Sequence, residues 1–521
     1  MRAPTFAFAS LLFAAVLTCA AVLADTARPP QSPDAGRIDV ILWFDTEDYL
    51  LPASDDAAKR VAELLTERGI HGTFKVVGEK ARTLERRGRR DVIKALRRHT
   101  IAYHSDLHSV HPTPAEYLAD CGLLDGMDEF VRREGRGAAD VRRIFRVDTL
   151  ACYGQPGSSW APQAVAALPR IGVAPHGVPC YVDEGSHVGL DHQPFWFAGA
   201  LNVYDMAENC TRVDLHDPAD AGPARERFQS IATRLRREHG GGLVSIYYHP
   251  CEWVHRQFWD GVNFARGANP PREAWTQPPQ RPPAETDAAF RQFAAYVDFL
   301  QSFPGVHFVT AADLPGLYPD LLRREGATRA DLDELAGRIT TPGAAGLDFQ
   351  SIGERSFSLA DQLALLSEAV GGWQQQREPQ FPIRPPVLLG PDRQPPPTRA
   401  ESAVDWTAFQ AATMDLLNFI HRQHRIPARV FLGAEPVPPG DFLFAVATAY
   451  QRHRRDGSFP NDIRVTLGHD LELLPARRVA ADQPGVYGDW IIHPAGFRAP
   501  QLLALARLQA WTLKPALRAV P

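Results

Sequence analysis

The sequence is poor in cysteine and has no excess of positive charge. It has six cysteines in 521 residues, and 56 lysines and arginines stand against 61 aspartates and glutamates, for a net charge of −5. Domains that bind nucleic acid are usually basic, so this balance argues against a nucleic-acid partner. The cysteines are widely spaced and match no zinc-knuckle pattern.

Long apolar runs are also missing after the first residues, and a span of the bilayer needs about 20 of them. Residues 1–24 have a basic start, an apolar run and small residues before Asp25, which is typical of a signal peptide cleaved after Ala24. The run could instead be a retained anchor. We expect residues 25–36 to be a linker and the mature protein to be exported, periplasmic or secreted, without a membrane partner.

Five cysteines remain after such cleavage. An odd number leaves at least one thiol unpaired unless it pairs between chains. We expect one or two disulfides and a buried leftover rather than a nucleophile. The five are Cys121, Cys152, Cys180, Cys210 and Cys251.

The length predicts at least two domains. Over residues 37–317, apolar strand-like runs alternate with helical patterns, which predicts an α/β domain with a parallel sheet, open or closed into a barrel. Residues 318–350 lose this rhythm and are predicted to be a linker. Over residues 351–521, a helical pattern, a proline-marked turn and a short β run ending in glycine recur three times, which predicts a smaller α/β repeat-like module.

Acidic residues follow the first predicted strand. Asp45, Glu47 and Asp48 come directly after the apolar run, and ligands gather at the C-terminal ends of strands in parallel α/β folds. Carboxylates packed there repel one another unless a cation or hydrogen bonds offset the charge. The alternative is that they cap and begin the next helix.

Histidines follow the third predicted strand, in the stretch IAYHSDLHSVH. On a helical turn, His104 and His108 would share a face and could reach one ion, with His111 outside it. An isolated pair of this kind could simply be exposed. Together with the acids they predict a divalent metal site, most simply for Zn²⁺, with Co²⁺ or a similar ion as alternatives.

A later predicted strand, LVSIYY, is followed directly by His249, which would lie near the same edge. Its imidazole could act as a general acid because its pKa lies near working pH. The alternative is a hydrogen-bonded loop histidine.

Five segments occur in an order that resembles a known family. They are FDTEDY, GIHGTFKVVG, HSDLH, GQPGSSWAP and IYYHP. Over residues 37–317 the chain resembles polysaccharide deacetylases of carbohydrate esterase family 4. The resemblance implies a distorted (β/α) barrel and a metal-dependent hydrolase. It would remove N- or O-linked acetyl groups from an acetylated polysaccharide or a peptidoglycan-like polymer.

The resemblance also assigns roles to residues. His104 and His108 match the two metal histidines, and the third ligand would be Glu47 by its spacing, with Asp48 as the fallback. Asp45 matches the catalytic base.

His249 matches the acid that protonates the leaving group. A backbone N–H near Gly157 could complete an oxyanion site. Gln155 lies in the same motif, and Trp160, Trp196 and Trp253 could stack on sugars; for each tryptophan, core packing is the alternative.

One position departs from the family pattern. Gly154 stands where the family usually has an arginine that orients the base. The acidic fourth motif is not evident either, and Asp183 or Asp191 could serve.

Two other functions therefore stay open. One is a weakly active or inactive carbohydrate-binding protein with a structural metal, and the other is a C–N hydrolase of a small amide. The C-terminal module faintly resembles a pseudomurein-binding repeat, which would tether the protein to a cell wall and raise the local substrate concentration. A structural cap without a ligand is the alternative.

Overall fold

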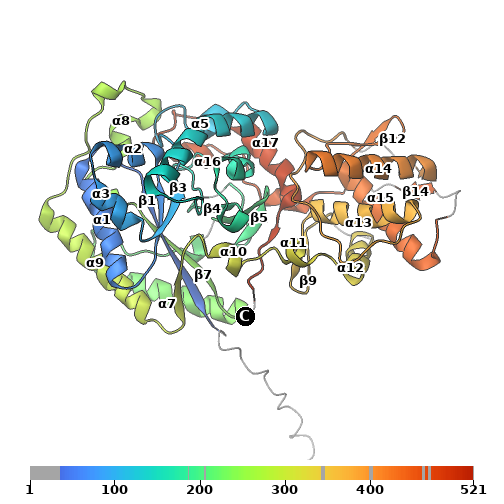
Figure 1. The fold of residues 1–521 in the computed structure, drawn as a ribbon, viewed down its shortest axis with the longest axis horizontal. Coiled ribbons are helices and arrows are strands. Elements are labelled where there is room, and N and C mark those ends of the chain that lie inside the picture. Colours follow the sequence, from blue (N-terminus) through green and yellow to red (C-terminus); the bar gives the residue numbers. More distant parts are fainter. Residues whose placement is uncertain are drawn as a thin grey trace, which may run out of the picture.

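The computed structural model describes residues 36–185, 187–204, 207–341, 346–397, 403–459, 464–466 and 471–519. The expected signal peptide and almost all of the linker after it lie outside these residues. The chain forms a larger lobe around a β-sheet and a smaller lobe rich in helices (Figure 1). Among the residues described, we find no helix with the length and apolar character to cross a bilayer.

A parallel sheet forms the centre of the larger lobe. Its order is β3-β2-β1-β7, and β8 also pairs with β1. β7 pairs with Ile38–Phe44 of β1, and β8 pairs with Ile38–Ile41, so β7 and β8 lie on opposite edges of β1. β2 pairs with Trp43–Thr46 and continues the edge of β8. The strands are β1 (Ile38–Thr46), β2 (Thr73–Val76), β3 (Thr100–Tyr103), β7 (Gly242–Tyr248) and β8 (Val306–Val309). The predicted mixed α/β class with a parallel sheet is confirmed.

A second group of strands continues this arrangement. Tyr153 makes single parallel bridges to Tyr103 on β3 and to Tyr181 on β4. Beyond it the order is β4-β6-β5-β15. These strands are β4 (Cys180–Val182), β5 (Phe195–Phe197), β6 (Ala200–Val203) and β15 (Lys514–Pro515).

Helices cover the sheet because their apolar positions recur every three or four residues. In α1, Ala58, Val61, Ala62 and Leu65 are buried, and the turn after the helix uses Gly69 at φ 69°. The longer helices of this lobe are α1 (Pro52–Glu67), α2 (Gly78–Arg86), α3 (Arg90–Leu96), α5 (Leu123–Phe145), α7 (Ala221–His239) and α9 (Pro283–Ser302). The shorter ones are α4 (Pro114–Leu118), α6 (Pro162–Ala167), α8 (Trp259–Asn263) and α10 (Leu314–Leu317).

The stretch predicted as a linker, residues 318–350, contains two helices, α11 (Leu321–Glu325) and α12 (Arg329–Ile339). A capping box on Thr328 begins α12, and Leu332 and Leu335 enter the core of the smaller lobe. The linker prediction is therefore wrong here. The charged composition belongs to the exposed face of an amphipathic helix.

The smaller lobe repeats a hairpin followed by a helix. The hairpin turns use Gly353 at φ 57° and Gly433 at φ 63°, a backbone conformation that favours glycine. The elements are β9 (Gln350–Ile352), β10 (Arg355–Phe357), α13 (Leu359–Gln374), β11 (Ala403–Asp405), α14 (Trp406–Gln423), β12 (Val430–Leu432), β13 (Glu435–Val437), α15 (Pro439–Asp456) and β14 (Arg464–Thr466). The predicted order of helix, turn and strand is found where β12 follows α14 and where β14 follows α15. The β run predicted after α13 forms only isolated bridges, at Ile383 and Leu389.

The end of the chain returns to the larger lobe. Leu502 and Leu503 of α17 (Pro500–Gln509) join the same core as β1, and β15 pairs with β5. Arg518 forms an ion pair with Asp39 on β1 at 2.7 Å. Residues 351–521 are therefore not one separate module. Val479, Tyr487 and Leu513 also pack in the core of the larger lobe, whereas Trp511 packs in the core of the smaller lobe.

All five cysteines between residues 36 and 519 are free thiols, so the expected disulfides are not formed. Cys152 and Cys180 pack in one apolar cluster, and Cys251 packs in another. Buried thiols of this kind behave as small apolar side chains.

Candidate active site

Four parallel strands end at one edge of the sheet and bring polar side chains together. Asp45 lies near the end of β1, and His104, Asp183 and His249 directly follow β3, β4 and β7. Parallel strands place their carboxyl ends at the same edge, so residues distant in sequence meet there.

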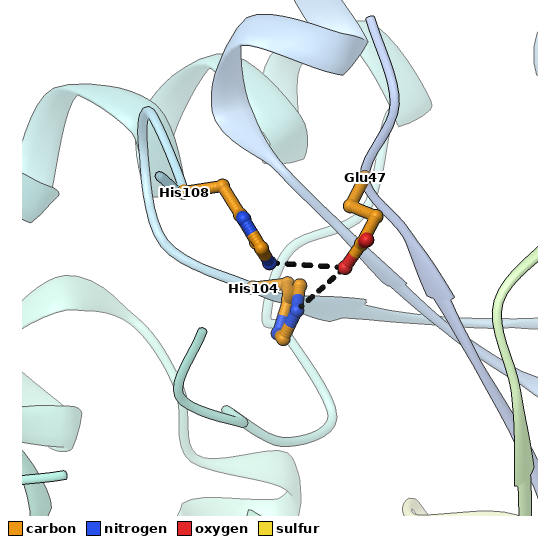
Figure 2. Close-up of side chains that lie close together, drawn as sticks. All are labelled: Glu47, His104 and His108. Atoms are coloured by element: carbon orange, nitrogen blue, oxygen red, sulfur yellow. Dashed lines mark ion pairs between the residues drawn. The ribbon is translucent and has the colours of Figure 1, made fainter. Parts of the chain in front are cut away.

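Glu47, His104 and His108 form a compact donor cluster, and Figure 2 shows their side chains converging. Glu47 Oε2 lies 3.3 Å from His104 Nε2 and 3.0 Å from His108 Nε2. Ligands about 2.0–2.2 Å from one tetrahedral ion would lie about 3.3–3.6 Å apart, close to these two distances, so the three donors fit a zinc-like ion. All three residues are buried.

Two of the donors are held by further hydrogen bonds. Trp259 Nε1 donates to Glu47 Oε1 at 2.8 Å, which leaves Oε2 toward the histidines. His104 Nδ1 lies 3.0 Å from the carbonyl of Gly154, and donating there leaves Nε2 as the free ligand atom. Burial holds the pKa of His104 below its usual value, which favours the neutral imidazole that binds metals.

His108 lies on an irregular loop, not on the helical turn that we expected. Its backbone has φ 57° and that of Ser105 has φ 64°, both in the left-handed region. Its N–H donates to Ser105 Oγ at 3.1 Å, and its Nδ1 lies 2.6 Å from Ser109 Oγ. Backbone strain of this kind concentrates at functional sites. Here it turns His108 Nε2 toward Glu47.

Asp45 is paired with a lysine that the sequence reasoning missed. Lys75 Nζ on β2 lies 2.9 Å from Asp45 Oδ1, and Asp45 Oδ2 lies 3.7 Å from His249 Nε2. Lys75 is fully buried, and burial disfavours its charge. Asp183 and Asp45 outweigh that effect and raise the pKa of Lys75. The available signal was a single charged residue inside the apolar run TFKVV.

Asp183 supplies the second acid of the site. It lies 3.2 Å from Lys75 Nζ and accepts a hydrogen bond from Gln155 Nε2 at 3.1 Å. Asp191, the other candidate, is exposed and pairs with Arg478. Gln155 therefore orients an acid of the site.

His249 is held from its outer side. Its Nδ1 bonds to Glu252, which in turn pairs with Arg212. Burial opposes the protonated imidazole, but nearby carboxylates, Glu47 first and then Glu252, outweigh it and raise the pKa of His249 to about 10. The His249 side chain is 17% exposed against 2% for His104, so the site opens on the side of His249.

The C-terminal strap, residues 484–497, forms one wall of the site. The Trp490 ring lies edge-on to His108, with 5.8 Å between ring centroids. A Cβ on Gly157 would come within 2.4 Å of that ring. The carbonyl of Ile491 accepts a hydrogen bond from the N–H of Arg266 at 2.7 Å. Sequence reasoning placed nothing of this half of the chain in the site, because 382 residues separate His108 from Trp490.

Three predicted site residues lie elsewhere. Asp48 accepts from the N–H of Leu50 and lies 2.9 Å from His255 Nε2, so it orders the loop and is not in the donor cluster. Trp160 and Trp253 are fully buried, and neither offers a ring face to a sugar.

Three further expectations can be placed. Gly157 borders the site beneath Trp490. Trp196 lies on β5 and is nearly buried in an apolar cluster of the larger lobe. His111 pairs with Glu116 at 2.7 Å and is outside the donor cluster, as predicted.

No family model and no curated protein matches the sequence. Several solved structures are similar to part of it. A protein from Mycobacterium smegmatis described as a polysaccharide deacetylase has a TM-score of 0.33 and 18% identity, and the match covers 56% of this chain and 93% of that one. A family 4 carbohydrate esterase from Streptomyces lividans, in complex with acetate, has a TM-score of 0.26 and 15% identity, and the match covers 51% of this chain and 89% of that one.

A mutant of a CE4 family pseudoenzyme is also similar, with a TM-score of 0.28 and 11% identity, over 54% of this chain and 68% of that one.

Proposed function

We propose that the protein is a metal-dependent hydrolase that removes N- or O-linked acetyl groups from a carbohydrate or cell-wall polymer. One observation supports this most. A carboxylate held by a cation, Asp45, and an imidazole held by a carboxylate, His249, adjoin a three-donor cluster at one sheet edge. These are the parts that hydrolysis of an acetyl group requires.

A divalent cation held by Glu47, His104 and His108, most simply Zn²⁺, would polarise the acetyl carbonyl and make water a better nucleophile. Asp45 would accept a proton from the attacking water. His249 Nε2 would donate a proton to the leaving amine or alcohol as the acyl bond breaks. Acetate is then released.

The arrangement also bears on the alternative of a non-catalytic binding protein. That alternative depended on Gly154 in place of an arginine. Lys75 provides a cation beside Asp45 at that point, which favours the hydrolase.

We extend the proposal to the setting of the protein. The first 24 residues are proposed to direct export, and the smaller lobe is proposed to hold the hydrolase near a cell-wall polymer. The basis for both is the sequence pattern.

Metal analysis with an acetate assay tests the proposed function. We expect about one zinc or similar ion per chain, and acetate release from acetylated chitooligosaccharide, xylan or peptidoglycan fragments. Glu47→Gln keeps the shape of the side chain but weakens it as a metal ligand. This variant should lose most of the bound metal and most of the acetate release. A reconstituted wild-type protein without metal and without acetate release would overturn the proposal in favour of a binding role.

Trp490→Ala tests the strap as a substrate wall. Trp490 is half-buried at the rim, and aromatic faces pack against sugars. We expect the KM for an oligosaccharide to rise about tenfold, corresponding to about 1.4 kcal/mol. Metal content should stay unchanged. Steady-state kinetics on short and long substrates measure this, and an unchanged KM on both would remove Trp490 from the substrate path.

A further inference from the structure

Lys75 is unusual in its position. It is a charged side chain within a fully buried four-residue strand, and its exposed fraction is 0%. Its ammonium lies 3.9 Å from the centre of the Trp43 ring and 3.1 Å from the carbonyl of Val182. Burying an ammonium costs several kcal/mol unless partners compensate, so its placement requires a strong local reason.

The partners of Lys75 are the two acids of the site. Its Nζ contacts Asp45 Oδ1 at 2.9 Å and Asp183 Oδ2 at 3.2 Å. One positive charge thus separates two buried carboxylates that would otherwise repel each other. The contact also engages Oδ1 of Asp45 and leaves Oδ2 on the side of His249.

Gly154 makes room for this ammonium. A Cβ at position 154 would lie 2.1 Å from Lys75 Nζ and 2.6 Å from Asp183 Oδ2. It would also lie 2.8 Å from the carbonyl oxygen of Val182, so no side chain fits there while Lys75 is present. The glycine and the lysine therefore form one structural unit, in which a side chain from β2 occupies the space in front of residue 154.

We propose that Lys75 is the positioning residue for the base Asp45, and that Gly154 is glycine because Lys75 occupies its side-chain space. The inference rests on the proposed hydrolase function. Lys75 reaches Asp45 from the neighbouring strand and fixes which carboxylate oxygen faces the reacting atoms. It does not touch substrate.

Kinetics of five variants on the full-length metal-loaded protein test this. Lys75→Met keeps the side-chain stem over Trp43 and removes the charge. We expect kcat to fall about 10²-fold, the loss that misplacement of a reacting group by about 1 Å can cause. KM and metal content should stay near those of the wild type.

A matched control separates this effect from loss of any buried lysine. Lys514 is also buried and also bridges two aspartates, Asp320 at 2.8 Å and Asp361 at 3.0 Å. Lys514→Met should lower Tm about as much as Lys75→Met does. It should leave kcat unchanged, because Asp320 and Asp361 lie outside the site.

A compensating arginine introduced at residue 154 completes the test. Gly154→Arg alone should be nearly inactive, since its Cβ collides with Lys75. In Lys75→Ala/Gly154→Arg the contact with Lys75 Nζ is gone, and only small shifts at Asp183 Oδ2 and at the Val182 carbonyl, 2.6 Å and 2.8 Å from the new Cβ, are still needed. The new guanidinium can then enter the vacated space, and kcat should recover at least tenfold relative to Lys75→Ala.

The outcomes are distinguishable. An active wild type with unchanged kcat in Lys75→Met overturns the role of Lys75 and leaves the hydrolase function standing. An active wild type with equal losses in Lys75→Met and Lys514→Met, without rescue, also overturns it. If neither the wild type nor Lys514→Met releases acetate from any substrate, the proposed function falls, and the role of Lys75 with it.

Discussion

Asp45→Asn is expected to lower kcat about 10³-fold while the protein keeps its metal and its fold. A general base contributes about 10²–10⁴-fold to a hydrolysis, and an amide in the same place cannot accept the proton. Metal content should not change, because Asp45 is not in the donor cluster. Acetate release under saturating substrate, with elemental analysis of the same sample, measures both quantities.

Asp39→Asn is a suitable control for this change. Asp39 is a buried carboxylate near the start of the same strand, where it pairs with Arg37 and Arg518. Its loss should reduce Tm and leave kcat unchanged. Turnover of Asp45→Asn equal to the wild type would end the assignment of Asp45 as the base.

His108→Ala is expected to remove both metal and hydrolysis without unfolding the larger lobe. One of three donors is lost, and the Glu47 carboxylate loses the partner 3.0 Å away. The backbone at residue 108 is already strained at φ 57°, so the change should affect the loop more than the sheet. Metal content, acetate release and a far-UV circular dichroism melt report the three effects.

His111→Ala is the matched control for the histidine pair. It lies three residues further along and pairs with Glu116. That variant should keep stoichiometric metal and most activity. Full acetate release by His108→Ala would remove His108 from the site.

Much of the site was predictable because parallel strands place their carboxyl ends at the same edge of a sheet. Asp45, His104 and His249 follow three apolar runs, and the rule that ligands gather at carboxyl ends brings them together without further information. The choice between Glu47 and Asp48 was not predictable in this way. It is decided by the contacts of the loop after β1 with residues that follow β7. The indole of Trp259 donates a hydrogen bond to Glu47, and the imidazole of His255 pairs with Asp48.

Other expectations failed for identifiable reasons. Helical spacing suggested how His104 and His108 share an ion, but the loop achieves it with left-handed backbone at Ser105 and His108. The side chains of Trp160 and Trp253 would suit either a sugar-binding cleft or an apolar core, and only their burial in the structure shows that they belong to the core.

The sequence by itself determined the α/β class of the larger lobe, the strand that each site residue follows, and the chemistry of the donors. These depend on local periodicity and on residue type. Tertiary structure alone decided that Lys75 meets Asp45 and Asp183, and that Trp490 covers Gly157 beside His108. Such contacts join elements far apart in the chain, and their geometry depends on how the cores pack, which no local pattern encodes.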